Sequence, residues 1–106
     1  MVEGVEFVSL RDLRGIIEPL RKKLRGRVRE AYVFGSVVEG SAIRGESDLD
    51  MIVIPREGER VDFFELLREE VDALLDLGVP LDLMVADNET YRPLIEEARR
   101  RGVRIV

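Results

Sequence analysis

Three aspartates stand out because each lies at or within an apolar stretch. Asp48 and Asp50 enclose a single leucine directly before the run Met-Ile-Val-Ile, and Asp82 interrupts the run Leu-Asp-Leu-Met-Val. Alternate residues of a β-strand share a face, so Asp48 and Asp50 are expected side by side. Carboxylates that close repel each other, and a divalent cation relieves the repulsion. The pair therefore indicates a metal site.

The ligands available to such a site are oxygens, because the chain has no cysteine and no histidine. Oxygen donors favour Mg²⁺ or Mn²⁺. Aspartate is rarely buried unless it is paired or bound to a metal, and the Lys or Arg nearest to Asp82 in sequence lies ten residues away. If the strand of Asp82 neighbours that of Asp48 and Asp50, we expect the three carboxylates to hold two Mg²⁺ ions about 3.5–4 Å apart, as in-line phosphoryl chemistry requires.

Each aspartate also has a plainer interpretation. A short Asp-x-Asp is often a strand end whose polar face meets water, and Asp82 on a sheet edge would meet water in the same way. The combination of the three aspartates favours the metal site, although the alternatives stay open on the residues alone.

A glycine–serine pair precedes the aspartates. Gly35-Ser36 follows the alternating stretch 28–34, and 11 residues separate it from Asp48. A glycine at a strand end lets a phosphate approach the backbone, and the N–H groups of the following turn can bind it together with the serine hydroxyl. Most such pairs are plain turns, so this one gains meaning from its place before the aspartates.

The absent residue types exclude several functions. Without Cys and His, the 106-residue chain has no disulfide, thiol nucleophile, Cys/His zinc site or Ser-His-Asp triad. Its net charge of -5 argues against a protein that coats nucleic acid. The basic run 21–29 is interpreted with equal weight as a solvated helix end and as a patch for a partner or nucleic acid. No aromatic residue interleaves with it to stack on single strands.

The elements that must position these residues follow from hydrophobic spacing. Ser9 and Asp12 form a capping-box pattern at the start of the first helix. We expect a short helical turn and a loop over 37–47, helices over about 10–24, 62–77 and 91–101, and strands over 28–34, 48–54, 79–85 and 103–106.

Three of these elements carry detailed expectations about how their residues divide between faces. In the first strand, alternation places Val28, Glu30, Tyr32 and Phe34 on one face. The second strand ends apolar on both faces, which predicts a place in the middle of a sheet. The inward face of the helix over 62–77 is expected to consist of Phe63, Leu66, Leu67, Val71, Leu74 and Leu75.

The alternating order of helices and strands predicts an α/β (α+β) fold. We expect a mixed β-sheet of about four strands with helices packed against it, in a single domain over residues 1–106. The N-terminus lacks a charged-then-apolar leader, and no apolar run approaches membrane-spanning length. These features predict a cytoplasmic protein with no membrane partner.

The order of the motifs resembles the minimal nucleotidyltransferase (MNT) domain of the DNA polymerase beta superfamily. That family's signature is Gly-Ser, a short spacer, Asp-x-Asp and a third Asp on a later strand. The strings Tyr-Val-Phe-Gly-Ser over 32–36 and Ser-Asp-Leu-Asp-Met-Ile-Val over 47–53 carry the resemblance, which covers about residues 9–106. The spacer is slightly longer than is common, and Val37-Val38-Glu39 stands where many members have an arginine and small residues.

The resemblance implies a reaction and a role for each site residue. ATP is the expected nucleotide substrate, with two Mg²⁺ ions. Gly35 and Ser36 would hold the β- and γ-phosphates, and Asp48 and Asp50 would bind both metals. Asp82 would bind the catalytic metal and act as a candidate general base. An acceptor hydroxyl would attack the α-phosphorus, and pyrophosphate would leave.

The resemblance also implies a partner. Minimal members of this kind are often paired, as antitoxins, with HEPN toxins, and known members transfer AMP to a tyrosine of the toxin. A partner protein is therefore the expected acceptor, unless a homo-oligomer builds the acceptor pocket. The main alternative is a non-catalytic module whose acidic middle, residues 45–90, neutralises a basic partner. Transfer to a small molecule such as an aminoglycoside is less favoured, because the chain shows no acceptor domain.

Overall fold

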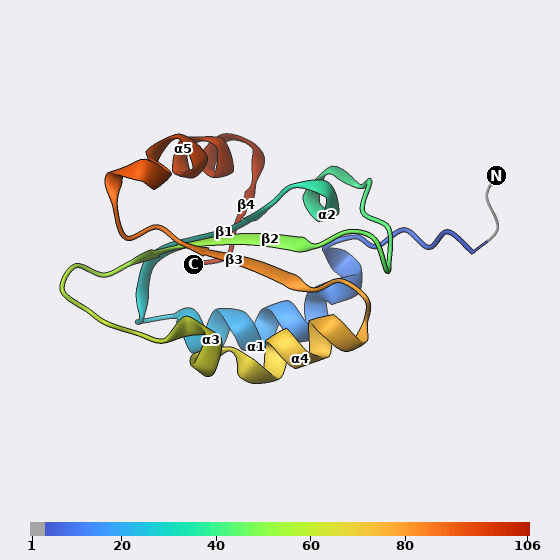
Figure 1. The fold of residues 1–106 in the computed structure, drawn as a ribbon, viewed down its shortest axis with the longest axis horizontal. Helices are drawn as coiled ribbons and strands as arrows, with labels where there is room; N and C mark the ends of the chain where they lie inside the picture. The colour runs from blue at the N-terminus through green and yellow to red at the C-terminus, as the bar shows by residue number, and fades with distance from the viewer. Residues whose placement is uncertain (1–3) are drawn as a thin grey trace.

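The computed structural model describes residues 4–106, which form a four-stranded mixed sheet flanked by helices (Figure 1). The strand order across the sheet is β3-β2-β1-β4. β2 runs antiparallel to β1 and parallel to β3, and β4 pairs antiparallel with the other side of β1. The strands are β1 (Val28–Phe34), β2 (Leu49–Pro55), β3 (Leu81–Val85) and β4 (Val103–Arg104). The expected α/β (α+β) class is confirmed.

The helices divide between the two faces of the sheet. α1, α3 and α4 lie on one face and α5 on the other, while α2 follows the end of β1 (Figure 1). Within residues 4–106, no helix is both long and apolar enough to cross a membrane. The helical segments are η1 (Arg11–Leu13), α1 (Arg14–Leu24), α2 (Ser36–Glu39), α3 (Phe63–Leu66), α4 (Arg68–Asp76), η2 (Glu89–Tyr91) and α5 (Arg92–Arg101).

β2 is buried on both faces, which confirms the prediction from its apolar second half. Leu49, Met51 and Val53 join the larger core beneath α1 and α4. Ile52 joins the smaller core beneath α5. Strand alternation therefore puts Asp50 on the same face as α5, just beyond the apolar part of that face.

The alternation predicted for β1 is interrupted at its start. The pairing register of β1 with β2 shifts between Val28 and Glu30. Because such a bulge changes the side to which a residue points, Val28 packs in the larger core with Ala31 and Val33. The prediction that Val28 shares a face with Glu30 was therefore wrong.

The helix expected over 62–77 is two helices. Leu67 adopts a non-helical conformation between α3 and α4 (φ −102°, ψ 15°). Leu67 is nevertheless fully buried, and the buried positions Phe63, Leu67, Glu70 and Leu74 keep helical spacing across the break. Leu75, expected to face inward, is 60% exposed, because it lies beyond the border of that buried stripe. That prediction was wrong.

The ends of the elements differ slightly from the expected bounds. The capping box at Ser9 is present: its N–H donates to Asp12 Oδ2 at 2.9 Å, and the N–H of Asp12 donates to Ser9 Oγ at 3.4 Å. The first turn is 3₁₀ rather than α. The last strand is only two residues long, although the Ile105 N–H still donates to the Ala31 carbonyl at 2.8 Å.

Candidate active site

The sheet register brings the sequence motifs together at one end of the molecule. Asp50 is paired in register with Phe34 on β1 and with Asp82 on β3. Phe34 is the last residue of β1, and Gly35-Ser36 follows it directly. Three segments that are distant in sequence therefore meet around the start of β2.

Gly35 and Asp50 are in direct contact. Gly35 has a φ of +79°, a conformation that L side chains rarely adopt. A Cβ atom built on Gly35 would overlap Oδ2 of Asp50. The Asp50 carboxylate thus lies against the backbone at the start of α2, and only glycine leaves it that space.

The first backbone N–H groups of α2 make no hydrogen bond within the described residues. The N–H groups of Val38 and Glu39 donate to the Gly35 carbonyl, whereas those of Ser36 and Val37 have no acceptor among residues 4–106. Val37 is buried in the larger core and Glu39 is exposed. The apolar residues after Gly35-Ser36 therefore anchor the turn, and the acidic one faces water.

The loop before Asp48 is tied to the turn before β3. The Gly45 N–H donates to the Gly78 carbonyl at 2.7 Å, and Arg44 Nε donates to the Leu77 carbonyl at 2.7 Å. These bonds join the approach to β2 with the approach to β3. Asp48 is therefore positioned by the same segment that leads to Asp82.

Burial and neighbouring charge act together on Asp50. Its partial burial and, after that, the neighbouring carboxylates of Asp82 and Asp48 together raise its pKa from 3.8 to about 6. Each of these causes disfavours the charged form of Asp50. A cation beside the three carboxylates would reverse that effect.

Asp82 is exposed, as in the plainer interpretation of this residue. Its strand, β3, lies at the edge of the sheet, and Leu81 and Leu83 beside Asp82 are half-buried. Leu81, Leu83 and Val85 pack on the larger core and Met84 on the smaller one. Asp82 thus faces water at a sheet edge and is also paired in register with Asp50, while its role as a metal ligand stays a prediction.

The acidic residues fit the donor chemistry of Mg²⁺ without forming a complete cage. Within residues 4–106, no three acidic side chains converge as a ready-made metal site. Mg²⁺ is usually held by one or two carboxylates together with substrate phosphates and waters. Asp50 and Asp82 can supply those carboxylates, and the exposed Asp48 lies next to them at the start of β2.

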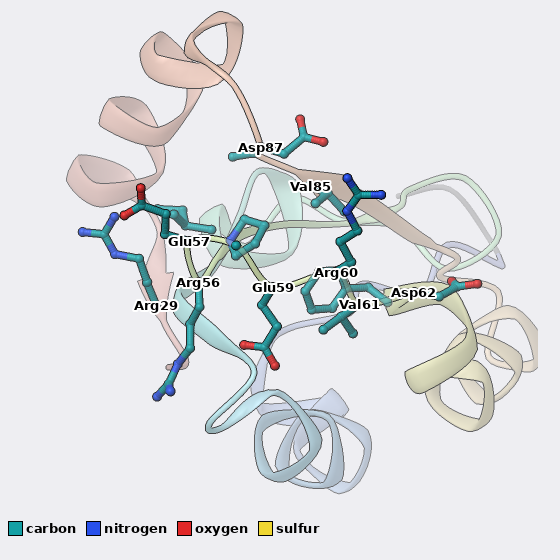
Figure 2. Close-up of a pocket in the computed structure, with 14 residues that line it drawn as sticks. Arg29, Arg56, Glu57, Glu59, Arg60, Val61, Asp62, Val85 and Asp87 are labelled. Carbon is teal, nitrogen blue, oxygen red and sulfur yellow. The ribbon is translucent and has the colours of Figure 1, made fainter.

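Two hollows in the protein surface lie at the end of the sheet opposite to Gly35, Asp50 and Asp82. The larger, about 940 Å³, is lined by residues at the end of β2, the end of β3 and the loop between β2 and α3. Figure 2 shows Arg29 and Arg56 on one side of it and Arg60 and Asp62 on the other. The smaller, about 390 Å³, lies between that end of the sheet and α5. Neither includes a candidate site residue.

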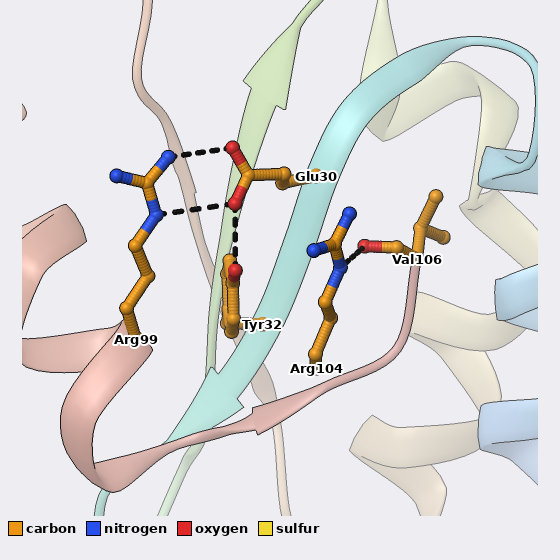
Figure 3. A network of polar contacts seen from close by, with 5 residues as sticks. All are labelled: Glu30, Tyr32, Arg99, Arg104 and Val106. Atoms are coloured by element: carbon orange, nitrogen blue, oxygen red, sulfur yellow. Dashed lines mark hydrogen bonds and ion pairs between the residues drawn. The ribbon is translucent and has the colours of Figure 1, made fainter.

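A polar network that the sequence did not single out holds α5 on β1 (Figure 3). Arg99 donates to both carboxylate oxygens of Glu30 at 3.1 and 2.6 Å, and the Tyr32 hydroxyl donates to Glu30 at 2.6 Å. The Arg104 guanidinium lies 6.0 Å from the centre of the Tyr32 ring. The only sequence signal was the placement of Glu30 and Tyr32 two residues apart on one strand face.

Comparison with known proteins identifies one family and one curated relative. A model of the nucleotidyltransferase domain family matches residues 13–105. A Methanocaldococcus jannaschii protein, provisionally assigned as a protein adenylyltransferase, is 29% identical over 91 residues, which cover 86% of each chain.

Solved structures share the fold at low sequence identity. A chain in a toxin–antitoxin crystal structure with AMP-PNP superposes with a TM-score of 0.59 at 20% identity, over 85% of this chain and 72% of that one. A second, from a complex of tri-AMPylated Shewanella oneidensis HEPN toxin with MNT antitoxin, has a TM-score of 0.55 at 21% identity, over 88% and 71%.

Proposed function

The chain belongs to the nucleotidyltransferase domain family, and we propose that it transfers AMP from ATP to a hydroxyl group of a partner protein. The observation that carries the proposal is the contact between the Gly35-Ser36 pair and the aspartates. The Asp50 carboxylate lies against Gly35 on one side and in register with Asp82 on the other. A nucleotide held at Gly35-Ser36 would therefore have its phosphates beside the carboxylates.

The reaction is an in-line displacement at the α-phosphorus. The acceptor oxygen forms a bond to the α-phosphorus, and the bond from that phosphorus to the oxygen bridging to the β-phosphate breaks. The electron pair of the broken bond leaves with pyrophosphate. The proton of the acceptor hydroxyl passes to the Asp82 carboxylate, which is exposed and ready to receive it.

The chain's own residues bind and orient the substrate. The free N–H groups of Ser36 and Val37 and the Ser36 hydroxyl would donate to the β- and γ-phosphates. Asp48, Asp50 and Asp82 would hold Mg²⁺, which supplies positive charge against the phosphate oxygens when it is bound. The anchored loop before Asp48 keeps the carboxylates in place, and catalysis then depends on positioning and charge.

The biological role proposed here is that of an antitoxin whose acceptor is a HEPN-type toxin. The support comes from the fold shared with antitoxin chains in toxin–antitoxin complexes and from the adenylyltransferase assignment of the M. jannaschii relative. The alternative is a non-catalytic module of the same fold that neutralises its partner by binding alone. The lack of a preassembled three-carboxylate cluster in the described residues is the observation in its favour.

A labelling experiment separates the two functions. The chain is co-purified with its partner and incubated with ATP labelled at the α-phosphate, with and without Mg²⁺. We expect label on the partner only with Mg²⁺, and none with the Asp48→Ala, Asp50→Ala double variant. Asp72→Ala, an exposed aspartate on α4, is the matched control and keeps full labelling. Persistent label on the partner of the double variant would exclude the proposal.

A further inference from the structure

β3 is an open edge of the sheet directly beside the proposed site. It has a neighbouring strand on one side only among residues 4–106, and it runs for five residues. The other edge strand, β4, is two residues long. Apart from Asp82, β3 carries no charge and contains no proline, so it lacks the usual protection of an edge against pairing with another chain.

The hydrogen bonds between β2 and β3 show which backbone groups of β3 face outward. The Leu49 N–H donates to the Pro80 carbonyl at 2.9 Å, and the Ala86 N–H donates to the Val53 carbonyl at 2.8 Å. Even-numbered residues therefore pair with β2, and alternation directs the N–H and C=O groups of Leu81 and Leu83 to the open side. These four groups form the beginning of a ladder for one more strand.

We propose that the acceptor polypeptide binds as an added strand on the edge of β3 and presents its hydroxyl residue opposite Asp82. The inference rests on the proposed AMP transfer and names how that reaction's acceptor is recognised. The occupant is an extended segment of a partner protein, held through its backbone by Leu81 and Leu83.

The pairing geometry makes Asp82 the residue that faces the acceptor side chain. In an added antiparallel strand, the residues opposite Leu81 and Leu83 exchange hydrogen bonds with them. The residue opposite Asp82 then occupies a non-hydrogen-bonded position, where facing Cβ atoms are about 4.5–5.5 Å apart. Its side chain points to the same face of the sheet as Asp82 and Asp50, because facing residues share a face.

Charge defines which segments fit. Asp82 is the one charged residue of β3, and Asp50 and Asp48 lie close enough for the three carboxylates to influence one another. Basic residues flanking the hydroxyl are therefore favoured in the acceptor, and acidic ones are disfavoured. The probe is accordingly a short peptide of alternating threonine and valine with lysine at both ends and one central tyrosine.

Hydrogen exchange measures the docking without any need for catalysis. Backbone amide exchange is followed by NMR on the wild-type chain, without nucleotide, at millimolar peptide. We expect the amides of Leu81 and Leu83 to exchange at least about tenfold more slowly with the peptide, since each gains a hydrogen bond. The same peptide with N-methyl groups on its pairing edge lacks those bonds and is expected to leave both amides unchanged.

A matched pair of variants connects docking to transfer. Leu83→Pro removes the outward N–H at an edge position where proline is tolerated, whereas Leu83→Ala removes the same side chain and keeps the N–H. With ATP and Mg²⁺, we expect Leu83→Pro to add AMP to the peptide at least about tenfold more slowly than Leu83→Ala. Both variants are expected to keep Mg²⁺-dependent ATP binding by calorimetry, which reports an intact site.

The outcomes separate this inference from the proposed function. Unchanged exchange at Leu81 and Leu83 with the unmodified peptide overturns the docking, whatever the activity. Equal transfer by Leu83→Pro and Leu83→Ala overturns it as well, as does a homodimer that covers the edge and excludes the peptide. Protection of both amides without transfer by the wild-type chain supports the docking and rejects the AMP transfer. The N-methyl peptide decides the question even if Leu83→Pro does not fold.

Discussion

At the scale of single residues, the site depends on Gly35 as much as on the carboxylates. Gly35 combines a positive φ with a contact to Asp50 that leaves no room for a Cβ atom. The glycine therefore sets where the Asp50 carboxylate lies relative to Ser36. Asp50, half-buried beside Asp82 and Asp48, is the carboxylate for which a bound cation matters most.

Gly35→Ala is expected to slow AMP transfer strongly while Gly40→Ala does not. Gly40 also has a positive φ of +83°, in the left-handed helical region, and nothing lies within 4 Å of its added Cβ. Gly40→Ala should lose about 1–2 kcal/mol of stability from the backbone, and Gly35→Ala should lose about 1–3 kcal/mol, because its ψ of −155° belongs to a region nearly restricted to glycine. Displacement of Asp50 should in addition lower the transfer rate of Gly35→Ala by roughly 100-fold.

Partner labelling and thermal unfolding of both variants measure these two effects separately. Equal rates in the two alanine variants would mean that the contact with Asp50 has no role in the reaction.

At the scale of elements, α5 is held on the sheet by charge as well as by apolar contact. Glu30 on β1 receives hydrogen bonds from Arg99 on α5 and from Tyr32 on its own strand. The hydrogen bonds from Arg99 lower the pKa of Glu30 despite its burial. Figure 3 shows Arg99 reaching from α5 to Glu30 on β1, with the Tyr32 hydroxyl on the same carboxylate.

Glu30→Gln should destabilise the fold by about 1 kcal/mol at neutral pH, a modest value because Arg99 is half exposed. The lowered pKa means that ionised Glu30 stabilises the folded state above its ordinary pKa of 4.5. That contribution is lost as the pH falls through the lowered value in the folded state. Urea unfolding of both proteins between neutral and acidic pH should therefore show a difference that shrinks toward acid. A difference independent of pH would contradict the role of the charge.

The buried face of α4 predicts opposite behaviour for two adjacent leucines. Leu74 is fully buried and Leu75 is 60% exposed. Leu74→Ala should cost about 2–5 kcal/mol of unfolding free energy, as for other core leucines. Leu75→Ala should stay within about 0.5 kcal/mol of the wild-type value. Chemical denaturation of the two variants tests this directly, and a large loss in Leu75→Ala would contradict the exposed position of that side chain.

At the scale of the whole molecule, the candidate site lies at one end of the sheet, outside both cores. One face of the sheet packs on the larger core with α1 and α4, and the other on the smaller core with α5 (Figure 1). The carboxylates of Asp50 and Asp82 lie where β1 ends and β2 and β3 begin, and the two surface hollows lie at the opposite end. A ligand bound at the aspartates would therefore contact the folded state without being part of its core.

ATP with Mg²⁺ should raise the stability of the wild-type chain. At a free ATP concentration 100 times its dissociation constant, the expected gain is about 2.7 kcal/mol. For a domain of this size, each kcal/mol moves the unfolding midpoint by roughly 4–8 °C. The Asp48→Ala, Asp50→Ala double variant should show no Mg²⁺-dependent gain in thermal unfolding. Asp72→Ala serves again as the control, and an equal gain in the double variant would place the nucleotide elsewhere.

The sequence by itself determined the kind of chemistry and most of the elements. The absence of Cys and His restricted the chain to oxygen ligands, and hydrophobic spacing located the strands that carry Asp50 and Asp82. These properties depend on residue type and local periodicity, which the chain carries without reference to its fold. The roles of Gly35, Ser36, Asp48, Asp50 and Asp82 in binding and catalysis remain predictions.

The tertiary structure decided which strands are neighbours and which of them is at the edge. The apolar strand of Asp82 left open whether this residue is buried or faces water, and strand order leaves it exposed beside Asp50. The bulge near Val28 likewise changes the face that simple alternation assigns. Exposure at an edge and a bulge both depend on contacts between distant segments, and local periodicity contains no information about those contacts.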